Sequence, residues 1–438
     1  MKKTITFTLL LCLLATGCNN LAKSKYTDPL VVQKLNNALT ETVVLDAFKP
    51  PVAARIYAYA NIAGYECLRY SDTSYHTLQR QLAGFDSLPV PENTANFNME
   101  VAAIIAFTQT AADMTYRDYK MLEIRDKLLA EYKQHLNKEE YERSIQFGEK
   151  VAARAIAYLR KDGYGLTRTL EKYMVKAAED KWQPTPPKYT EPCEPYWYQI
   201  KTFSFDSISQ FVAGKPVPFS TDKSSDFYKI NEQLRQLTNN LTTEQKAIGS
   251  YWDDNPAPLV LEGHLMETYK QISPGGHWIS IAGAVCQNEK KSILQTSAIT
   301  TMVAIAVSDG FKSCWYTKFL YETVRPVTYI NKYIDPAWQP LIETPMFPEY
   351  TSAHSTISSA AATVLEHYFG NNYKFTDSTE VPYNKGVRSF NSFRAAADEV
   401  SVSRVYGGIH YPFSCDSGIA KGHDLGINLI NRLTTSPR

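Results

Sequence analysis

Hydrophobic positions in the N-terminal third of the chain recur with a helical period. Val31, Leu35, Leu39 and Val43 follow one another at intervals of four residues, a spacing that places side chains on one face of a helix. Three further segments show the same pattern: 56–70, 101–116 and 141–163. The N-terminal region, 19–181, is therefore predicted to consist of long amphipathic helices.

The pattern changes between residues 182 and 224. This segment is rich in proline and aromatic residues, and proline cannot continue a helix. We expect an ordered connecting loop, because so many aromatic side chains need a surface to pack on. A helical pattern resumes at Ser225 and continues through a C-terminal bundle, 225–438, in which Thr242 or Thr243 caps a helix. Strand patterns are scarce, so the fold class is predicted to be all-α, with two antiparallel helical lobes.

The N-terminus carries a separate signal. Lys2 and Lys3 precede an apolar run, 5–14, and the sequence LLATGC then ends at Cys18. This pattern is typical of an export signal and is too short for a transmembrane helix. It resembles a bacterial lipobox, which predicts a lipoprotein signal peptide over 1–18 and a lipidated Cys18. An ordinary secretory signal cleaved elsewhere is the alternative. The predicted location is the cell envelope, facing the periplasm or in the outer membrane, with the lipid anchor as the sole membrane contact.

Composition narrows the classes of protein further. The 438 residues are 44% hydrophobic, enough for a large core, and 46 Lys and Arg balance 45 Asp and Glu. This balance gives no indication of a nucleic-acid partner, and none is expected. An odd number of widely spaced cysteines after Cys18 argues against a disulfide framework and against metal-ligand pairs. They are predicted to be small buried residues: Cys67, Cys193, Cys286, Cys314 and Cys415.

Candidate chemistry lies in the last third of the chain. In KFLYETVRP, Lys318 and Arg325 stand seven residues apart, which on a helix is two turns and about 10 Å of rise. Both cations would then lie on one helical face with Trp315, where they can grip the same anion. Two solvated cations on a helix surface are the alternative.

A second candidate segment is PEYTSAHSTISSA, in which Ser352, Ala353 and His354 begin a predicted helix rich in small residues. The free N–H groups and the dipole of a helix N-terminus attract anions. His354 can equally be an ordinary buried side chain.

The third segment is SRVYGGIHYPFSCDSG. Arg404 precedes His410 by six residues, and Gly407 and Gly408 lie between them. Glycine allows a backbone to approach a ligand closely, and an arginine fork matches a tetrahedral oxyanion. Together, the three segments in this order predict one oxyanion site.

The motifs KFLYETVRP, TSAH and SRVYGGIH resemble the three signature motifs of the superfamily of vanadium-dependent haloperoxidases and type 2 phosphatidic acid phosphatases. The soluble, all-helical bacterial haloperoxidase-like branch is the most similar. PPVAARIYAYANIAGYE, YWDDNP and PGGHW extend the likeness over nearly the whole mature chain. The resemblance implies a two-lobed helical bundle of the vanadium haloperoxidase and acid phosphatase type.

The resemblance also implies a role for each motif residue. His410 would be bonded to the central atom, as the vanadium ligand of vanadate or as the nucleophile that forms a phosphohistidine, and His354 would act as acid and base. Four side chains would hold the equatorial oxygens of bound vanadate or phosphate: Lys318, Arg325, Arg404 and Ser352. The backbone N–H groups of Ala353 and Gly408 would hold the same oxygens. Trp315 and Phe347 would line a halide pocket.

Two positions depart from the family pattern. Ala353 replaces the more usual glycine of the second motif, which keeps a small residue beside the anion. Many members have an aspartate four residues after the metal-binding histidine, where it orients the ring; here the residue is Ser414. Asp416 reaches His410 only if the loop bends, so a serine or a backbone carbonyl is expected to orient His410 instead.

Three functions remain open at this point. The favoured one is a vanadium-dependent haloperoxidase, with vanadate as cofactor and hydrogen peroxide and halide as substrates, because the long N-terminal region, Trp315 and Phe347 resemble that group. The alternative is a phosphatase that hydrolyses a phosphate monoester through a phosphohistidine, with phosphate as competitor or substrate analogue of vanadate. The third is a non-catalytic anion-binding lipoprotein of the envelope.

His264 and His277 fall outside the motifs and are expected to be structural or to support the site indirectly.

Overall fold

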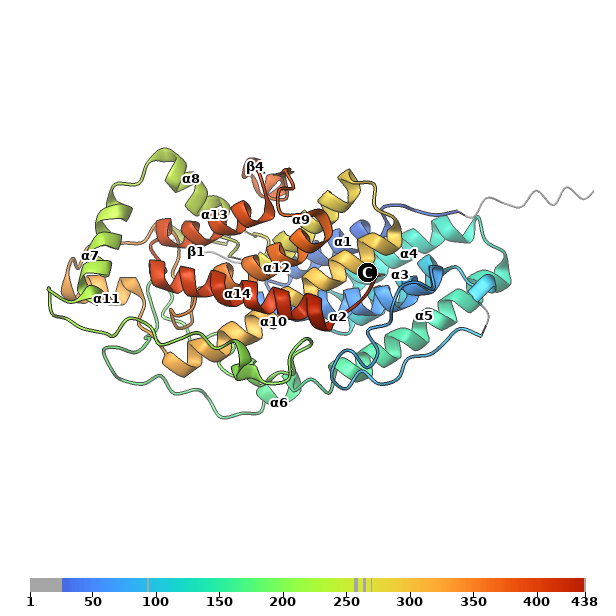
Figure 1. The fold of residues 1–438 in the computed structure, drawn as a ribbon, viewed down its shortest axis with the longest axis horizontal. Coiled ribbons are helices and arrows are strands. Elements are labelled where there is room, and N and C mark those ends of the chain that lie inside the picture. Colours follow the sequence, from blue (N-terminus) through green and yellow to red (C-terminus); the bar gives the residue numbers. More distant parts are fainter. Residues whose placement is uncertain (1–25, 93, 256–258, 263–264, 269, 437–438) are drawn as a thin grey trace, which may run out of the picture.

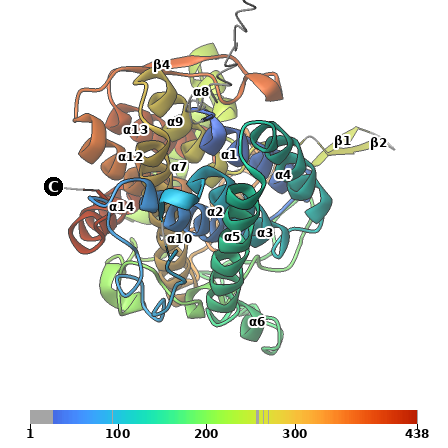
Figure 2. The same ribbon diagram turned by 90° about the vertical axis from the view of Figure 1, so that its right-hand side faces the viewer.

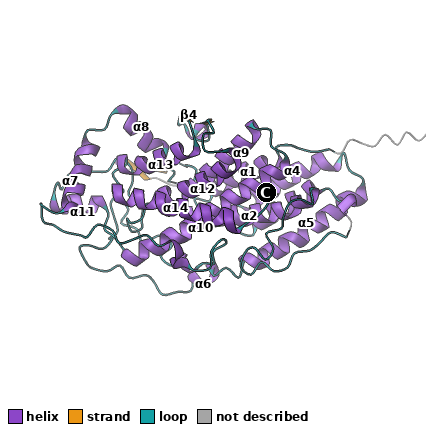
Figure 3. Ribbon diagram, in the orientation of Figure 1, coloured by secondary structure: helices purple, strands orange, loops and turns teal. Residues whose placement is uncertain are grey.

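The computed structural model describes residues 26–92, 94–255, 259–262, 265–268 and 270–436, so Cys18 and His264 lie outside the described residues. The described chain is mainly helical, and its strands form two short antiparallel hairpins (Figure 3). The α-helices are α1 (Val31–Leu45), α2 (Pro50–Leu68), α3 (Met99–Ala112), α4 (Asp118–Lys133), α5 (Lys138–Leu159), α6 (Tyr164–Thr167), α7 (Asp226–Asn239), α8 (Thr243–Tyr251), α9 (Pro274–Asn288), α10 (Ile293–Tyr321), α11 (Pro326–Tyr333), α12 (Ala353–Phe369), α13 (Phe393–Tyr406) and α14 (Pro412–Arg432). The strands are β1 (Leu259–Glu262), β2 (Leu265–Thr268), β3 (Phe375–Asp377) and β4 (Arg388–Phe390). The all-α prediction is confirmed.

Local sequence explains where several helices begin. Pro50 starts α2, because proline lacks the N–H that a first helical residue leaves unpaired. Thr242 caps α8 through a capping box with Gln245, which agrees with the predicted cap. The N-terminal helices end earlier than the predicted boundary at 181: the last one, α6, ends at Thr167, and no helix lies between 168 and 225 apart from two short 3-10 turns.

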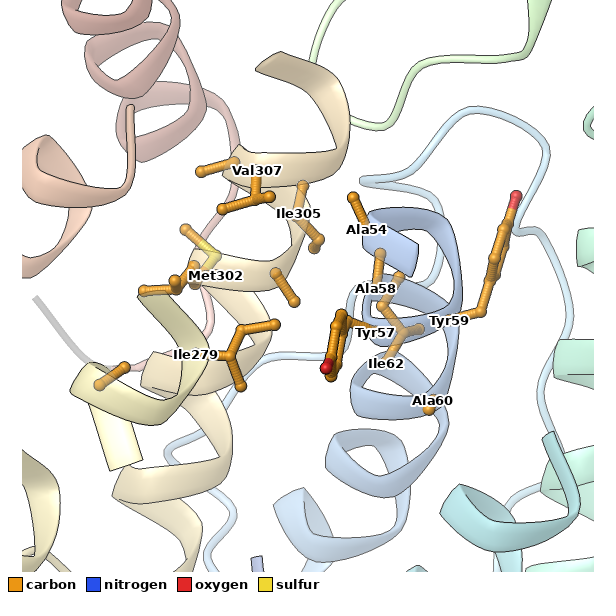
Figure 4. Close-up of a cluster of buried hydrophobic side chains, with 14 of the residues drawn as sticks. Ala54, Tyr57, Ala58, Tyr59, Ala60, Ile62, Ile279, Met302, Ile305 and Val307 are labelled. Carbon is orange, nitrogen blue, oxygen red and sulfur yellow. The ribbon is translucent and has the colours of Figure 1, made fainter. Parts of the chain in front are cut away.

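One hydrophobic cluster runs through the N-terminal and C-terminal helices. Helix α2 lies against α10 at its centre, and in Figure 4 Tyr57, Ala58 and Ile62 of α2 lie on the side toward Ile305 of α10. Figure 1 shows α3, α4 and α5 toward one end of the elongated molecule and α7, α8 and α11 toward the other. In the perpendicular view, α5 and α4 lie beside α2 and α3 (Figure 2). The C-terminal bundle is thus built directly onto the N-terminal helices.

Helices α12 and α14 pack unusually closely, because α14 presents glycine toward α12. A Cβ at Gly422 would lie 2.1 Å from the carbonyl oxygen of Thr356, so only glycine fits there. This contact fixes α12, which carries the second motif, against α14, which begins two residues after His410. The first and third chemical motifs reach the same region through α10 and α13.

The connecting loop is ordered through α10. The buried carboxylate of Asp309 accepts hydrogen bonds from the backbone N–H groups of Phe203 and Ser204, at distances of 2.7 to 3.1 Å, and from the Ser204 hydroxyl at 2.8 Å. Helix α10 is 29 residues long and apolar enough to cross a membrane by length and composition, but 89% of its most apolar window is buried inside the protein. It is the central core helix of the C-terminal bundle.

Candidate functional site

Lys318 and Arg325 do not share a helical face, which corrects the expectation from their spacing. Helix α10 ends at Tyr321, Glu322 adopts a left-handed conformation (φ 53°), and Arg325 is the N-cap residue of α11. Pro326 forces this break, since it starts a new helix instead of continuing the old one. The two cations nevertheless approach each other, because the break turns Arg325 back toward the end of α10, and both contact the same ring, that of Phe347.

Lys318 is fully buried. Its ammonium donates to the backbone carbonyls of Pro348 at 2.8 Å and Glu349 at 3.0 Å. Burial, together with the charge of the neighbouring Arg325, lowers the pKa of Lys318 to about 7. An anion at this place would restore the charge of Lys318.

The two arginines are held rigidly and keep donor groups free. Arg325 donates from Nε to the Phe347 carbonyl at 3.0 Å and from Nη1 to the Ile409 carbonyl at 2.7 Å, while its buried Nη2 has no hydrogen-bond partner among the described groups. Arg404, on α13, donates from Nη1 to the Trp252 carbonyl, and its buried Nε has no hydrogen-bond partner within the described residues. Each guanidinium therefore offers at least one N–H to a ligand.

His410 lies between Glu349 and Arg325. Its Nδ1 is 2.7 Å from Oε1 of Glu349, and its Nε2 is 3.2 Å from Nη1 of Arg325. A guanidinium can only donate, so Nε2 carries the lone pair and Nδ1 carries the proton. Burial, followed by the charges of Arg325 and Lys318, holds the pKa of His410 well below its ordinary value. The ring is neutral and presents the tautomer that can bond a metal or a phosphorus atom.

Glu349 replaces the aspartate of the family pattern from a different part of the chain. It is fully buried and also accepts the backbone N–H of Tyr411 at 3.1 Å. The expectation that a serine or a backbone carbonyl orients His410 is wrong: Glu349 contacts Nδ1, the Ser414 hydroxyl lies near Glu349 and lowers the pKa of that acid, and Asp416 is exposed on α14. Burial raises the pKa of Glu349 to about 7, although Arg325 and Lys318 oppose this shift.

The second motif forms the N-terminus of α12. Ser352 is the N-cap, and its Oγ accepts the backbone N–H of Ser355 at 3.3 Å and the Ser355 hydroxyl at 2.8 Å. The Ser352 hydroxyl proton is thus left to donate elsewhere. Ala353 is the first helical residue, a position whose N–H has no partner within a helix.

His354 is half-buried, and its Nε2 is buried without a hydrogen-bond partner among the described groups. Burial and the charge of Arg404 hold the pKa of His354 well below its ordinary value. Gly408 adopts a left-handed conformation (φ 75°), but its N–H donates to the Val405 carbonyl at 2.9 Å. The role implied for this N–H in holding the anion therefore requires that bond to open.

A small cavity of about 70 Å³ leads to these groups, lined among others by Phe347, His354 and Arg404. Its volume suits small molecules, since drug-sized ligands need roughly 300 to 1,000 Å³. Trp315 lies behind Phe347, with ring centres 4.9 Å apart, and donates its indole N–H to the Cys193 carbonyl at 3.1 Å. Phe347 lines the cavity, whereas Trp315 is fully buried behind it.

Sequence reasoning missed Glu349 and the acidic pair that follows α8. Glu349 lies five residues before His354, inside the segment singled out, but spacing gave no sign that it contacts a histidine 61 residues away. Asp253 and Asp254 line the cavity and attract Arg404. Their motif, YWDDNP, supported the family resemblance, although no role was assigned to it.

The residues present fit a tetrahedral oxyanion such as vanadate. Lys318, Arg325 and Arg404 bring three cationic side chains to one buried place, and among the described residues Glu349 is the one acid in direct contact with the ring of His410. Buried donors without partners cost free energy unless a ligand completes them. The unpartnered N–H groups of the two arginines meet that condition for an anion, and the lone pair of His410, which faces Nη1 of Arg325 in the free site, suits an electrophilic central atom.

This arrangement defines an all-helical protein with a buried site whose residues fit an oxyanion, and the comparisons with known proteins show its family. The family model of the second helical-bundle domain of vanadium chloroperoxidase matches residues 298–436, which contain all three motifs. The chain is similar to a bacterial vanadium-dependent iodoperoxidase, with 36% identity, 95% of this chain and 99% of that chain covered, and a TM-score of 0.88. It belongs to the vanadium-dependent haloperoxidase superfamily.

More distant structures show the same fold. A holo-type bacterial vanadium-dependent chloroperoxidase is 15% identical, with 93% of this chain and 96% of that chain covered and a TM-score of 0.69. An apo-type bacterial vanadium-dependent chloroperoxidase is 14% identical, with 87% of this chain and 93% of that chain covered and a TM-score of 0.65. A search of curated proteins found no match.

Proposed function

We propose that the protein is a vanadium-dependent haloperoxidase that oxidises iodide with hydrogen peroxide. The single observation that carries the proposal is the His410 ring, held neutral with Nε2 unprotonated at the meeting point of Lys318, Arg325 and Arg404. The likeness to the iodoperoxidase supports iodide as the halide. The small cavity over Phe347 and His354 suits peroxide and a halide ion better than an organic phosphate.

Each residue has a role that follows from its contacts. Nε2 of His410 would bond the vanadium of vanadate, while the oxygens would be held by Lys318, Arg325, Arg404, Ser352 and the amide of Ala353. When bound, vanadate would supply Lewis-acid activation of peroxide for oxygen transfer to halide, without a change in the oxidation state of the metal. Glu349 positions His410 and keeps its Nδ1 protonated.

His354 is suited to hold and move a proton. It is neutral in the free site because Arg404 and burial disfavour its charge, so Nε2 can accept a proton from incoming peroxide. Bound anion would favour the charged form, which could then return the proton to a departing oxygen. Phe347 and the backbone of Pro348 and Glu349, whose carbonyls accept the hydrogen bonds of Lys318, keep bulk water away from the buried cations and from His410.

The test uses the chain from Asn19 onward, incubated with orthovanadate, in assays of peroxide-dependent oxidation of iodide and bromide. We expect iodide oxidation that requires vanadate and disappears in His410→Ala. Release of phosphate from a generic monoester, inhibited by vanadate and without halide oxidation, would replace the proposal by the phosphatase alternative. Inactivity in both assays, with vanadate bound, would favour the non-catalytic anion-binding protein.

We further propose that the protein is an exported lipoprotein of the cell envelope. The support is the charged, apolar and small-residue succession that ends at Cys18. Metabolic labelling with a fatty acid tests it: the wild-type chain should be labelled and Cys18→Ser should not. An unlabelled, cleaved wild-type chain would indicate an ordinary secretory signal.

A further inference from the structure

A buried cluster of acids surrounds His277, outside the three motifs. His277 is the fourth residue of α9 and is fully buried. Its Nδ1 lies 3.1 Å from both carboxylate oxygens of Asp254, and its Nε2 lies 2.8 Å from Oδ2 of Asp377. Two ring nitrogens thus face two different carboxylates.

Glu380 adds a third carboxylate. It is fully buried, its Oε1 lies 3.5 Å from Nδ1 of His277, and neither of its oxygens has a hydrogen-bond partner among the described groups. Lys385 approaches the other oxygen at 3.2 Å. One ligand atom each of Asp254, His277 and Glu380 lies within 4.8 Å of the others. Three buried carboxylates here face one lysine, so the cluster needs further positive charge, which a bound cation, an imidazolium at His277 or a shared proton would supply.

We propose that Asp254, Glu380 and Nδ1 of His277 bind a divalent transition-metal cation of the Zn²⁺ or Mn²⁺ class. One imidazole nitrogen and two carboxylates are ligands that suit these cations, whereas Ca²⁺ needs six or more oxygens. Ligand atoms in tetrahedral contact with Zn²⁺ at roughly 2.1 Å lie about 3.4 Å apart. The separations of 3.1 Å and 3.5 Å from Nδ1 to the two acids bracket that value.

Asp377 completes the arrangement. A metal-binding histidine normally donates its other ring N–H to a carboxylate, which fixes the tautomer. The 2.8 Å contact between Nε2 and Asp377 is such a bond. Charges also balance with a metal present, because three carboxylates face one lysine and one divalent cation.

The cation would support the oxyanion site from outside it. Trp252 stacks on His277 with ring centres 4.5 Å apart, and the Trp252 carbonyl accepts the bond from Arg404. Binding of Asp254 to the metal would fix this segment, and with it the position of Arg404. The metal is thus a second inorganic site with a structural role, independent of vanadate.

The experiment measures metal binding by the full mature chain without vanadate or peroxide, so that it does not depend on the proposed activity. The protein is treated with EDTA, dialysed, and titrated with Zn²⁺ and with Mn²⁺, with elemental analysis for stoichiometry and calorimetry for affinity. We expect one equivalent of one of these ions per chain and a higher Tm in its presence. A folded wild-type protein that binds neither ion, with an unchanged Tm, would overturn the proposal in favour of a proton shared by Asp254 and Glu380.

Variants locate the ion. Glu380→Gln, which keeps the shape of the side chain, should abolish stoichiometric binding, and Asp377→Asn should weaken it by about 10- to 100-fold. His76→Gln is the matched control, because His76 is an exposed histidine of the kind that binds metals adventitiously. Binding that persists in Glu380→Gln and is lost in His76→Gln would place the ion on the surface and overturn the proposal.

Discussion

Nδ1 of His410 lies 2.7 Å from Oε1 of Glu349, and this contact joins two of the three sequence motifs. Because Glu349 is buried and also accepts the N–H of Tyr411, it determines both the tautomer and the orientation of the ring. The family pattern places an acid four residues after the histidine. In this chain the acid that contacts Nδ1 comes instead from the segment that precedes α12.

Glu349→Gln should lower vanadate affinity by about 10- to 100-fold, the usual effect of removing a carboxylate behind a metal-binding histidine. The amide oxygen still accepts a hydrogen bond, but the ring loses basicity when the charge is removed. Titration of the vanadate-free protein with orthovanadate measures this effect.

Ser414→Ala is the matched control for Glu349→Gln. The Ser414 hydroxyl makes no hydrogen bond to the ring of His410, although it lies near enough to Glu349 to lower the pKa of that acid. The backbone carbonyl of Ser414, which accepts the N–H of Ser352 at 3.3 Å, is retained in alanine. Vanadate affinity should therefore be nearly unchanged. A large loss in Ser414→Ala, with none in Glu349→Gln, would transfer the positioning role to the serine.

Anion affinity should fall as the pH rises through about 7. Burial lowers the pKa of Lys318 to about 7 and raises the pKa of Glu349 to about 7. Above that pH the free site loses the charge of Lys318, so the binding of an anion must take up a proton, whereas ionised Glu349 keeps Nδ1 of His410 protonated and the ring basic. Each proton taken up changes affinity by roughly tenfold per pH unit.

Tungstate is a suitable probe, because this tetrahedral anion keeps its charge across the neutral range. Calorimetry at several pH values should give a slope of about one proton in the wild type, which reports the protonation of Lys318 on anion binding. A flat profile in the wild type would mean that Lys318 stays charged in the free site.

The helices and the membership of the superfamily could be predicted from the sequence, since both depend on local periodicity and motif order. Thr242 as a cap and Ser352 as the start of α12 follow from short-range rules. The separation of Lys318 and Arg325 onto two helices could have been suspected from Pro326, but the left-handed turn at Glu322 has no signal in its residue type.

Contacts between distant segments could not be predicted. The contact between Glu349 and His410 joins residues 61 positions apart and depends on the packing of α12 against α14. The contact between His277 and Asp377 joins residues 100 positions apart and depends on the packing of α9 against the core. Charge and spacing along one sequence contain no information about such pairs, whereas burial and hydrogen bonding in the folded chain reveal them directly.

The two aromatic residues of the predicted halide pocket should behave differently. Phe347→Leu should raise the KM for iodide several-fold, because Phe347 lines the cavity and its ring lies 4.8 Å from Nζ of Lys318. Trp315→Phe should leave that KM unchanged but lower the stability by about 1 to 3 kcal/mol, since the Cys193 carbonyl loses its donor. Steady-state kinetics and thermal unfolding of both variants measure these effects, and a KM change confined to Trp315→Phe would assign the pocket to the tryptophan.

The last prediction concerns the loop between the two helical regions. Asp309 holds this loop through Phe203 and Ser204 and pairs with the buried Lys312 at 3.2 Å. Asp309→Ala would leave an unpaired buried ammonium, which costs roughly 3 to 5 kcal/mol, and would free the loop backbone.

We expect a lower Tm and faster proteolytic cleavage within 182–224 for Asp309→Ala. Ser204→Ala is its control, because it removes one of the hydrogen bonds to Asp309 and leaves the ion pair intact, so its cost should be near 1 kcal/mol. Equal stability losses in the two variants would show that the loop, and not the ion pair with Lys312, accounts for the contribution of Asp309. A stability of Asp309→Ala well below that of Ser204→Ala would instead show that the buried ion pair with Lys312 accounts for most of the contribution of Asp309.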